Sequence, residues 1–309
     1  MTSAIATLAQ HLTAALDPAP QETRRLFHGR GRCWPGLEQI TVDWLQGVLS
    51  VALFREPAPD QLAELEAMLN ALAQTPQWTG EAILIQHRYL PDSPGQWLVG
   101  GPIQQREVVE DGLRYLLDLG VRQNNGLFLD MRYGRRWVRE QSAGKRVLNL
   151  FAYTCGFSVA AIAGGAEQVV NLDMAKSALS RGRENHRLNG HDVGQVAFLG
   201  HELFKSWGKV RKYGPYDLVI IDPPTFQRGS FVLTQDYAKI LRRLPELLRE
   251  GGTVLACVND PGIGSAFLIE GMAEQAPALK FVERLENPPE FPDVDVEGGL
   301  KALVFRQQV

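Results

Sequence analysis

Residues 146–173 constrain the fold more than any other stretch, because they read as strand, helix and strand in immediate succession. The apolar run at 147–151 alternates little, which is typical of a parallel strand covered on both faces. A turn at 153–156 leads into an alanine-rich helix that ends at two glycines, and a second strand ends at Asp173. The pattern predicts a βαβ unit at the centre of a mostly parallel α/β sheet.

The end of this unit predicts a nucleotide-cofactor site. Backbone amides at a helix start can meet a ligand, and Asp173 at a strand end can accept both hydroxyls of a ribose. A pyrophosphate needs the closely spaced glycines of GxGxxG, whereas this turn offers only Gly156 among Phe151, Tyr153 and Phe157. The turn therefore favours S-adenosylmethionine over a dinucleotide. An ordinary βαβ core without a ligand is the alternative.

Composition sets few further limits. The chain has 309 residues, 45% of them hydrophobic, enough for one large or two ordinary domains. A net charge of -3 gives no global argument for a nucleic-acid partner. The 3 cysteines lack metal-ligand spacing, which favours reduced thiols, no metal and a cytoplasmic location. No apolar run has membrane-spanning length, so we expect no membrane partner.

The first third of the chain predicts a separate, smaller domain. We expect an N-terminal helix within residues 1–20, then a small α+β domain at 21–105 and the cofactor domain at 106–309. Strands are predicted within 41–54, split near Gln46, and at 82–87, with a helix at 60–73 between them. Arginines at 24, 25, 30 and 32 surround Trp34. They form either a nucleic-acid surface or solvated charges around a turn.

The remainder extends the α/β pattern. A hairpin is predicted around 108–115, and Asp130 is expected where a strand passes into a helix. Helices are predicted at 175–188, 233–249 and 264–274, and strands at 196–199, 216–221, 253–257, 280–285 and 302–306. We therefore expect one large, mostly parallel sheet with an antiparallel end.

Glu202 follows the third strand of this pattern. It could accept a hydrogen bond from the exocyclic amine of adenine, with Leu203 and Phe204 beside the ring. Alternatively, Glu202 could serve as the N-terminal charge of a helix.

The fourth and fifth strands end in residues that suit methyl-acceptor chemistry. Asp222 is followed by Pro223 and Pro224, which withhold their amides and leave the carboxylate available to an amine on a planar substrate. Phe226 could stack on that substrate. Cys257 ends the fifth strand, at the edge where open α/β sheets bind ligands. It could be a nucleophile there or an inert core residue.

Four motifs together resemble a known family. They are FLDMR at 128–132, NLFAYTCGFSVAA at 149–161, NLDMAKSALSRGRENHRLNG at 171–190 and DPPTF at 222–226. They resemble class I S-adenosylmethionine-dependent methyltransferases related to the bacterial 23S ribosomal RNA cytosine-5 methyltransferases. The resemblance begins near Leu26, so we expect the N-terminal RNA-binding PUA domain of that family to be absent.

The resemblance implies a Rossmann-like domain with a seven-stranded sheet and a set of cofactor-binding residues. Met131 stands where the family commonly has glutamine, and Ala256 and Val258 replace the serines that flank the family's cysteine. The implied cofactor residues are Arg132, Phe151, Tyr153, Thr154, Gly156, Asp173, Met174, Glu202, Leu203 and Asp222.

The implied reaction is methylation of cytosine C5 in RNA, with 23S ribosomal RNA as the suggested partner. Cys257 would attack C6 and Asp222 would hold the base. Pro223, Pro224 and Phe226 would contact the substrate. One alternative is direct transfer to a guanine or another nitrogen in RNA, or to a small molecule. Another is a non-catalytic binding protein that keeps the fold. The sequence leaves the oligomeric state open and is compatible with a dimer.

Overall fold

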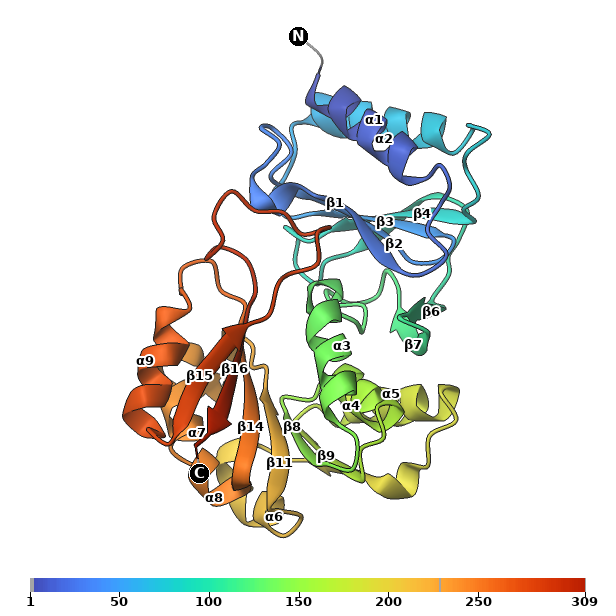
Figure 1. The fold of residues 1–309 in the computed structure, drawn as a ribbon. Coiled ribbons are helices and arrows are strands. Elements are labelled where there is room, and N and C mark those ends of the chain that lie inside the picture. Colours follow the sequence, from blue (N-terminus) through green and yellow to red (C-terminus); the bar gives the residue numbers. More distant parts are fainter. Residues whose placement is uncertain (1–2, 228, 309) are drawn as a thin grey trace. The chain divides into compact units, whose positions relative to one another are not determined.

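The chain folds as two units, which the structure separates at Leu129 (Figure 1). The computed structural model describes residues 3–227 and 229–308. Unit 1 comprises Met1–Leu129 and Pro289–Asp295, and unit 2 comprises Asp130–Pro288 and Val296–Val309. Within the described ranges, no helix is both long and apolar enough to cross a lipid bilayer.

Unit 1 is built on a five-stranded sheet in the order β1-β2-β3-β4-β5. Helices α1 and α2 lie together on one face of this sheet (Figure 1), and their leucines, spaced by three and four residues, fill the core between helices and sheet. The predicted helices and strands of this region are confirmed. The elements are α1 (Ala4–Ala15), β1 (Arg24–His28), η1 (Gly29–Gly31), β2 (Ile40–Trp44), β3 (Val48–Leu53), α2 (Pro59–Leu72), β4 (Ala82–His87) and β5 (Gly95–Val99).

The hairpin of β6 (Gln105–Glu110) and β7 (Leu113–Asp118) also belongs to unit 1. The backbone N–H of Thr23 donates to the carbonyl of Val109 (2.9 Å), and Arg106 Nε donates to the carbonyl of Gln46 (2.8 Å). These bonds tie the hairpin to the small domain. The predicted boundary near residue 105 therefore differs from the structure, because sequence patterns do not show which sheet a hairpin joins.

Unit 2 contains the predicted seven-stranded sheet, in the order β10-β9-β8-β11-β14-β16-β15. Within this sheet, β16 alone runs opposite to the other six strands. The mostly parallel α/β fold is therefore confirmed. The strands are β8 (Arg146–Leu150), β9 (Gln168–Asp173), β10 (Val196–Gly200), β11 (Tyr216–Ile221), β14 (Leu248–Val258), β15 (Leu279–Arg284) and β16 (Lys301–Gln307).

Helices cover both faces of the large sheet. One face carries α3 (Arg132–Gln141), α4 (Gly156–Ala163) and α5 (Lys176–Leu188), and the other carries α6 (Trp207–Arg211), α7 (Leu233–Leu241), α8 (Leu244–Leu247) and α9 (Ala266–Gln275). Because strand residues alternate between faces, Leu255 and Cys257 point toward α3 and α4, whereas Val254 and Ala256 point toward α7 and α9.

Two local predictions differ from the structure. Asp130 lies within the short 3-10 turn η2 (Leu129–Met131), and the residues directly before this turn are not assigned to a strand. The helix predicted at 233–249 is broken in two, and its last residues already belong to β14. Pro245, which cannot donate a backbone hydrogen bond, lies at the start of the second piece, where a proline is tolerated.

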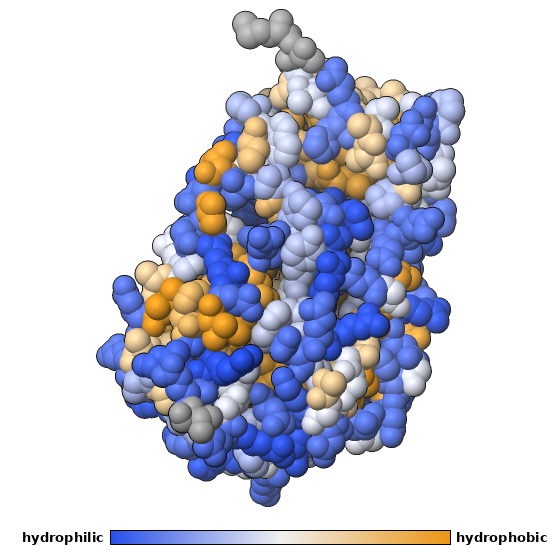
Figure 2. Space-filling view, in the orientation of Figure 1, coloured by the Kyte–Doolittle hydropathy of each residue, from blue (hydrophilic) through white to orange (hydrophobic). Residues whose placement is uncertain are grey.

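The edge strand β15 carries exposed apolar side chains. Phe281 and Val282 are 44% and 49% exposed, and Figure 2 shows hydrophobic residues gathered near α9 and β15. The pairing register of β15 shifts between Phe281 and Glu283, which indicates a bulge. A bulge twists an edge strand and hinders its pairing with another chain.

Candidate functional site

The turn after β8 has an unusual backbone. Phe151, Tyr153 and Cys155 have φ angles of 58°, 46° and 64°, in the left-handed region that side-chain-bearing residues seldom adopt. The Asp173 carboxylate, at the end of β9, accepts the backbone N–H of Tyr153 (2.8 Å) and of Ala175 (2.7 Å). Such backbone conformations persist only where the surroundings hold them, and they cluster at ligand sites. Asp173 thus fixes the turn.

Close packing of α5 supports the same turn. A Cβ atom added to Gly182 would lie 2.3 Å from the sulfur of Cys155 and 3.2 Å from the carbonyl oxygen of Thr154. Cys155 is fully buried beside Leu179, and burial raises the pKa of its thiol. Cys155 is therefore a packing residue.

A buried chain of hydrogen bonds lies beneath the turn and joins both strands to α4 and α5. Asn149 Nδ2 donates to Asn171 Oδ1, and Asn171 Nδ2 donates to Ser158 Oγ, both over 2.9 Å. Ser158 Oγ lies 2.9 Å from Nε2 of His186, whose Nδ1 lies 3.0 Å from a nitrogen of His191. Burial and, to a lesser extent, the neighbouring His191 together lower the pKa of His186 to about 3. Both helices that flank the turn are thereby tied to the sheet.

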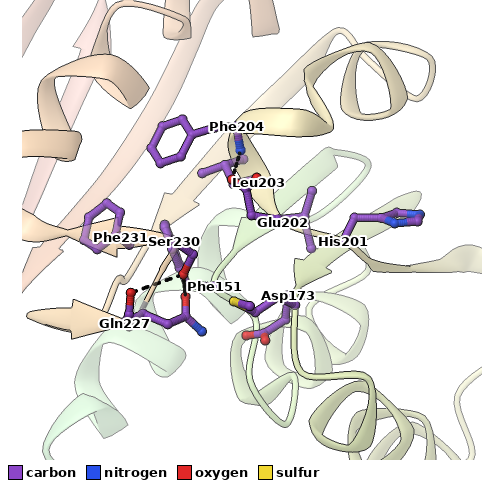
Figure 3. A pocket seen from close by; sticks show the side chains of 11 residues that line it. Phe151, Asp173, His201, Glu202, Leu203, Phe204, Gln227, Ser230 and Phe231 are labelled. Carbon is purple, nitrogen blue, oxygen red and sulfur yellow. Dashed lines mark hydrogen bonds between the residues drawn. The ribbon is translucent and has the colours of Figure 1, made fainter.

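A pocket opens beside the turn (Figure 3). It has an empty volume of about 290 Å³. The Phe151 and Phe231 rings meet edge to face, with centroids 5.0 Å apart. The lining residues are Phe151, Leu172, Asp173, Met174, His201, Glu202, Leu203, Phe204, Gln227, Ser230 and Phe231.

Glu202 combines both roles that the sequence left open. It lines the pocket, and its Oε1 accepts the backbone N–H of Phe204 (2.7 Å), which caps the 3-10 turn η4 (Leu203–Lys205). Its Oε2 lies 3.4 Å from Nζ of Lys205, whose side chain is 84% exposed. An ion pair this exposed contributes little energy. The cap instead holds the Glu202 carboxylate at the pocket wall.

The pocket chemistry fits the adenosine part of S-adenosylmethionine. The Asp173 carboxylate is an acceptor suited to a ribose diol, and aromatic and aliphatic side chains surround the remaining space. Burial raises the pKa of Asp173, whereas the N–H groups of Ala175 and Tyr153 oppose that rise by stabilising the charge. Asp173 would hold the ribose, and Leu203 and Phe204 would flank the adenine.

The predicted cofactor residues divide into two groups. Five of them line the pocket directly: Phe151, Asp173, Met174, Glu202 and Leu203. Of the others, Tyr153, Thr154 and Gly156 lie at the turn, whereas Arg132 and Asp222 come from other segments of unit 2. Tyr153 contributes its bonded N–H, Thr154 is buried and accepts from Asn185 through its carbonyl (3.1 Å), and Gly156 begins α4. Arg132 is the buried first residue of α3.

Several pocket residues were not predicted. Gln227, Ser230 and Phe231 come from a small hairpin, β12 (Phe226–Gln227) and β13 (Phe231–Val232), that follows the DPPTF segment. Ser230 Oγ donates to Gln227 Oε1 over 2.9 Å. The continuation of the DPPTF loop was the only sequence signal for this hairpin, and nothing in the sequence showed that it folds back onto the end of β8.

Asp222 lies in an electrostatically unusual position. It follows β11 directly, beside the end of β14, since Ile221 pairs with Ala256. Its pKa is raised to about 7, first by burial and then by the negative charge of Asp130, while Arg135 opposes the shift. Asp130 is held in turn, because its Oδ2 accepts from Nδ2 of Asn259 (2.9 Å). A carboxyl group with this pKa can carry or accept a proton near neutral pH.

The substrate residues predicted around Asp222 differ in exposure. Pro223 is buried, whereas Pro224 is exposed and the Phe226 side chain is 64% exposed. An exposed aromatic ring beside a titratable carboxyl group suits contact with a planar substrate.

Cys257 is fully buried. Its side chain lies in an apolar cluster with Met131, Phe157 and Ala302, and its carbonyl accepts from the Tyr237 hydroxyl (3.1 Å). Burial raises the pKa of the thiol well above its ordinary value, and the charges of Asp222 and Asp130 raise it further. In this arrangement the thiolate needed for nucleophilic attack is disfavoured.

Comparison with known proteins agrees with this geometry. A family model for S-adenosylmethionine-dependent methyltransferases matches residues 24–306. The chain belongs to this family. Its cofactor is therefore S-adenosylmethionine.

Several curated relatives are named as ribosomal RNA methyltransferases. The methyltransferase is 27% identical to the putative ribosomal RNA large subunit methyltransferase YwbD of Bacillus subtilis, over 92% of this chain and 74% of the relative. It is 31% identical to ribosomal RNA large subunit methyltransferase I of Serratia proteamaculans, over 75% of this chain and 59% of the relative. A match to the enzyme of the same name from Aeromonas salmonicida is 35% identical, over 50% of this chain and only 40% of the relative. The chain thus spans less than two thirds of the length of two of these three relatives.

Solved structures share the whole fold. A Streptococcus mutans structure described as an S-adenosylmethionine-dependent methyltransferase aligns with a TM-score of 0.86 at 23% identity, over 98% of this chain and 80% of that chain. The tRNA m1G37 methyltransferase of M. jannaschii aligns with a TM-score of 0.61 at 15% identity, over 89% of this chain and 77% of that one.

Proposed function

We propose that the methyltransferase transfers a methyl group from S-adenosylmethionine to a nitrogen of a base in RNA, with large-subunit ribosomal RNA as the substrate. The names of the relatives support RNA as the substrate class. The observation that carries the choice of nitrogen is the burial of Cys257 in an apolar cluster, which disfavours its thiolate, whereas Asp222, whose pKa is raised to about 7, lies four residues before the exposed ring of Phe226.

Asp222 has the properties of a general base for transfer to nitrogen. The base nitrogen attacks the methyl carbon, and the carbon–sulfur bond breaks with its electron pair passing to sulfur. The methylated nitrogen then loses a proton, which the Asp222 carboxylate accepts. A base with a pKa near the working pH is well suited to this step, which typically contributes about 10²–10⁴-fold to a rate.

Phe226 and Pro224 would hold the target base. Both are exposed; Pro224 lies two residues and Phe226 four residues beyond Asp222. A base stacked on the Phe226 ring would present its edge to the carboxyl group, and stacking on an aromatic side chain is worth about 1–3 kcal/mol per base.

Cytosine C5 is the second candidate, and the proximity of Cys257 to Asp222 is the observation that favours it. The Asp222 charge raises the pKa of the Cys257 thiol, so the two groups are close enough to interact. Transfer to C5 would require this thiol to leave its apolar cluster and ionise before attacking C6. That requirement makes transfer to nitrogen the better supported reaction.

The experiment is nucleoside mass spectrometry after incubation of unmodified 23S ribosomal RNA with isotopically labelled cofactor. The proposal predicts label on a base nitrogen, retained in Cys257→Ala and reduced about 10²-fold or more in Asp222→Asn. Cys33→Ala, at an exposed cysteine, is the matched control.

Two results would overturn the proposal. Label in 5-methylcytidine, lost in Cys257→Ala, would establish transfer to cytosine C5. Absence of label in RNA from a preparation that binds the cofactor by calorimetry would exclude RNA as the substrate.

A further inference from the structure

Three strands of unit 1 end at the same edge of its sheet. Strands β1 and β3 each run antiparallel to β2, and β3 runs parallel to β4, so β1, β3 and β4 point the same way. The residues that follow these strands are therefore neighbours. Phe54 follows β3, Arg88 follows β4, and Arg30 lies in the 3-10 turn after β1. We call these three residues the arginine–phenylalanine cluster.

Both guanidinium groups of the cluster lie over one aromatic ring. The Arg30 Cζ is 4.2 Å and the Arg88 Cζ is 4.8 Å from the centroid of the Phe54 ring. A cation over an aromatic face is attracted by the negative charge density of the ring. The ring thus holds two positive charges near each other that would otherwise repel.

Positive charge is concentrated at this edge. The pKa of Arg88 is lowered by burial and then by the charges of Arg30 and Arg25, while Asp43 opposes the shift. Burial and the same two arginines lower the pKa of His28 to about 3, so His28 stays neutral. An anion placed at the cluster would relieve this repulsion.

Arg88 also has unused hydrogen-bonding capacity. Its Nη2 donates to Asn124 Oδ1 (3.3 Å), but its buried Nε has no hydrogen-bond partner in the part of the chain that the structure describes. A buried donor without a partner is unfavourable, because it has lost its hydrogen bond to water. A small shift of the side chain toward a bound anion would satisfy this donor.

The other arginines expected at a nucleic-acid surface are engaged with acids of unit 1. Arg24 pairs with Glu290 (3.4 Å), Arg25 with Asp43 (2.5 Å) and Arg32 with Asp293 (3.0 Å). The indole of Trp34 packs 4.8 Å from the Phe27 ring and 5.4 Å from the His11 ring, at the edge of the core. The basic loop as a whole is therefore not one binding surface.

We propose that the arginine–phenylalanine cluster binds a backbone phosphate of RNA. Guanidinium groups match phosphate oxygens in geometry and charge. The Phe54 ring already carries the guanidiniums, so we assign it to support of the arginines rather than to stacking of a base. The contact would position the RNA without reading its sequence. The proposal rests on RNA being the substrate and adds a residue-level anchor in unit 1.

The experiment measures binding of a labelled RNA hairpin by fluorescence anisotropy at several salt concentrations. The proteins are wild type, Arg30→Gln, Arg88→Gln, the double variant, and Arg114→Gln as a control on the exposed face of β7, where Arg114 pairs with Glu107. Each cluster variant should bind several-fold more weakly and lower the slope of log K against log salt by about 1. Arg88→Lys keeps the positive charge but lacks the planar guanidinium group that can donate two parallel hydrogen bonds. Its loss of RNA affinity should therefore be smaller than that of Arg88→Gln but not absent. Thermal unfolding verifies that each variant is folded.

Three outcomes would overturn the proposal. One is wild-type affinity and salt slope in the double variant, and another is an equal loss in Arg114→Gln. The third is binding of inorganic phosphate at the cluster that leaves the affinity for RNA unchanged. That result would make the cluster a site for free phosphate.

The two proposals can fail separately. RNA binding through the cluster without methylation of any RNA by the wild type would refute the proposed function alone. Methylation with unchanged RNA binding by the double variant would refute only the phosphate site.

Discussion

Replacement of Asp222 by asparagine should stabilise the protein at neutral and alkaline pH but leave its stability in acid nearly unchanged. The pKa of the folded carboxyl is raised to about 7, whereas its ordinary value is 3.8. Below that ordinary value the group is protonated in both the folded and the unfolded chain. As pH rises through this window, only the unfolded chain ionises, so the wild-type free energy of unfolding falls. Above the folded pKa the penalty is constant.

The magnitude follows from the size of the pKa shift. The difference between about 7 and 3.8 is about 3 units. Each unit corresponds to about 1.4 kcal/mol, so the penalty reaches roughly 4 kcal/mol when the group is fully ionised. This is an upper value, because water and neighbouring side chains rearrange around the charge. It is still a large share of the roughly 5–15 kcal/mol that stabilises a typical domain.

The assay is urea unfolding of wild type and Asp222→Asn from about pH 4 to pH 8, which spans the window between the two pKa values of 3.8 and about 7. The stability advantage of the variant should grow with pH by up to about 1.4 kcal/mol per unit and level off above pH 7. Asp130→Asn should reduce the effect, because it removes the charge that helps to raise the pKa of Asp222.

Asp236→Asn is a control of opposite sign. Burial raises the pKa of Asp236, but hydrogen bonds from Lys239 and from the backbone of Val232 outweigh it and hold the pKa below its ordinary value. Its ionised form therefore stabilises the fold, so this variant should be less stable than wild type by a constant amount above pH 3.8, and the difference should shrink only at lower pH. A pH-independent difference between wild type and Asp222→Asn, or a loss of stability in that variant at pH 8, would refute the reasoning.

Further predictions concern the cofactor turn and its support. Asp173→Asn should weaken S-adenosylmethionine binding about 10–100-fold in calorimetry, since it loses a charged acceptor worth about 1.5–3 kcal/mol. Gly182→Ala should destabilise the protein by about 1–3 kcal/mol in urea unfolding through its overlap with Cys155, and Cys155→Gly in the same chain should recover most of that loss; no recovery would place the strain elsewhere. Because the pKa of His186 is lowered to about 3 from 6.5, wild-type stability should fall as pH drops below 6.5, and a His186→Gln variant should show a shallower fall in the same titration.

Local patterns predicted most of unit 2 because each depends on near neighbours in the chain. A βαβ unit is specified by a strand at 147–150 without alternation of apolar and polar residues, by the turn that follows it and by Asp173. None of these signals depends on the rest of the molecule. Asp222, Glu202 and Cys257 could be placed at one edge of the sheet, since parallel strands share a direction. Their chemistry could not be predicted in the same way.

The tertiary structure decided which neighbours each of these residues meets. The sequence left open whether Cys257 is a nucleophile or a core residue, and it did not show that the charges of Asp130 and Asp222, which help to set its pKa, act on it. The pocket contribution of Phe231, the boundary at Leu129 and the meeting of Arg30 with Arg88 depend likewise on contacts between distant segments. The sequence alone determined the fold and the family, because both follow from the order of local elements. The identity of the reacting group and the RNA anchor depend on electrostatic fields and packing, which exist only once the strands have been brought together.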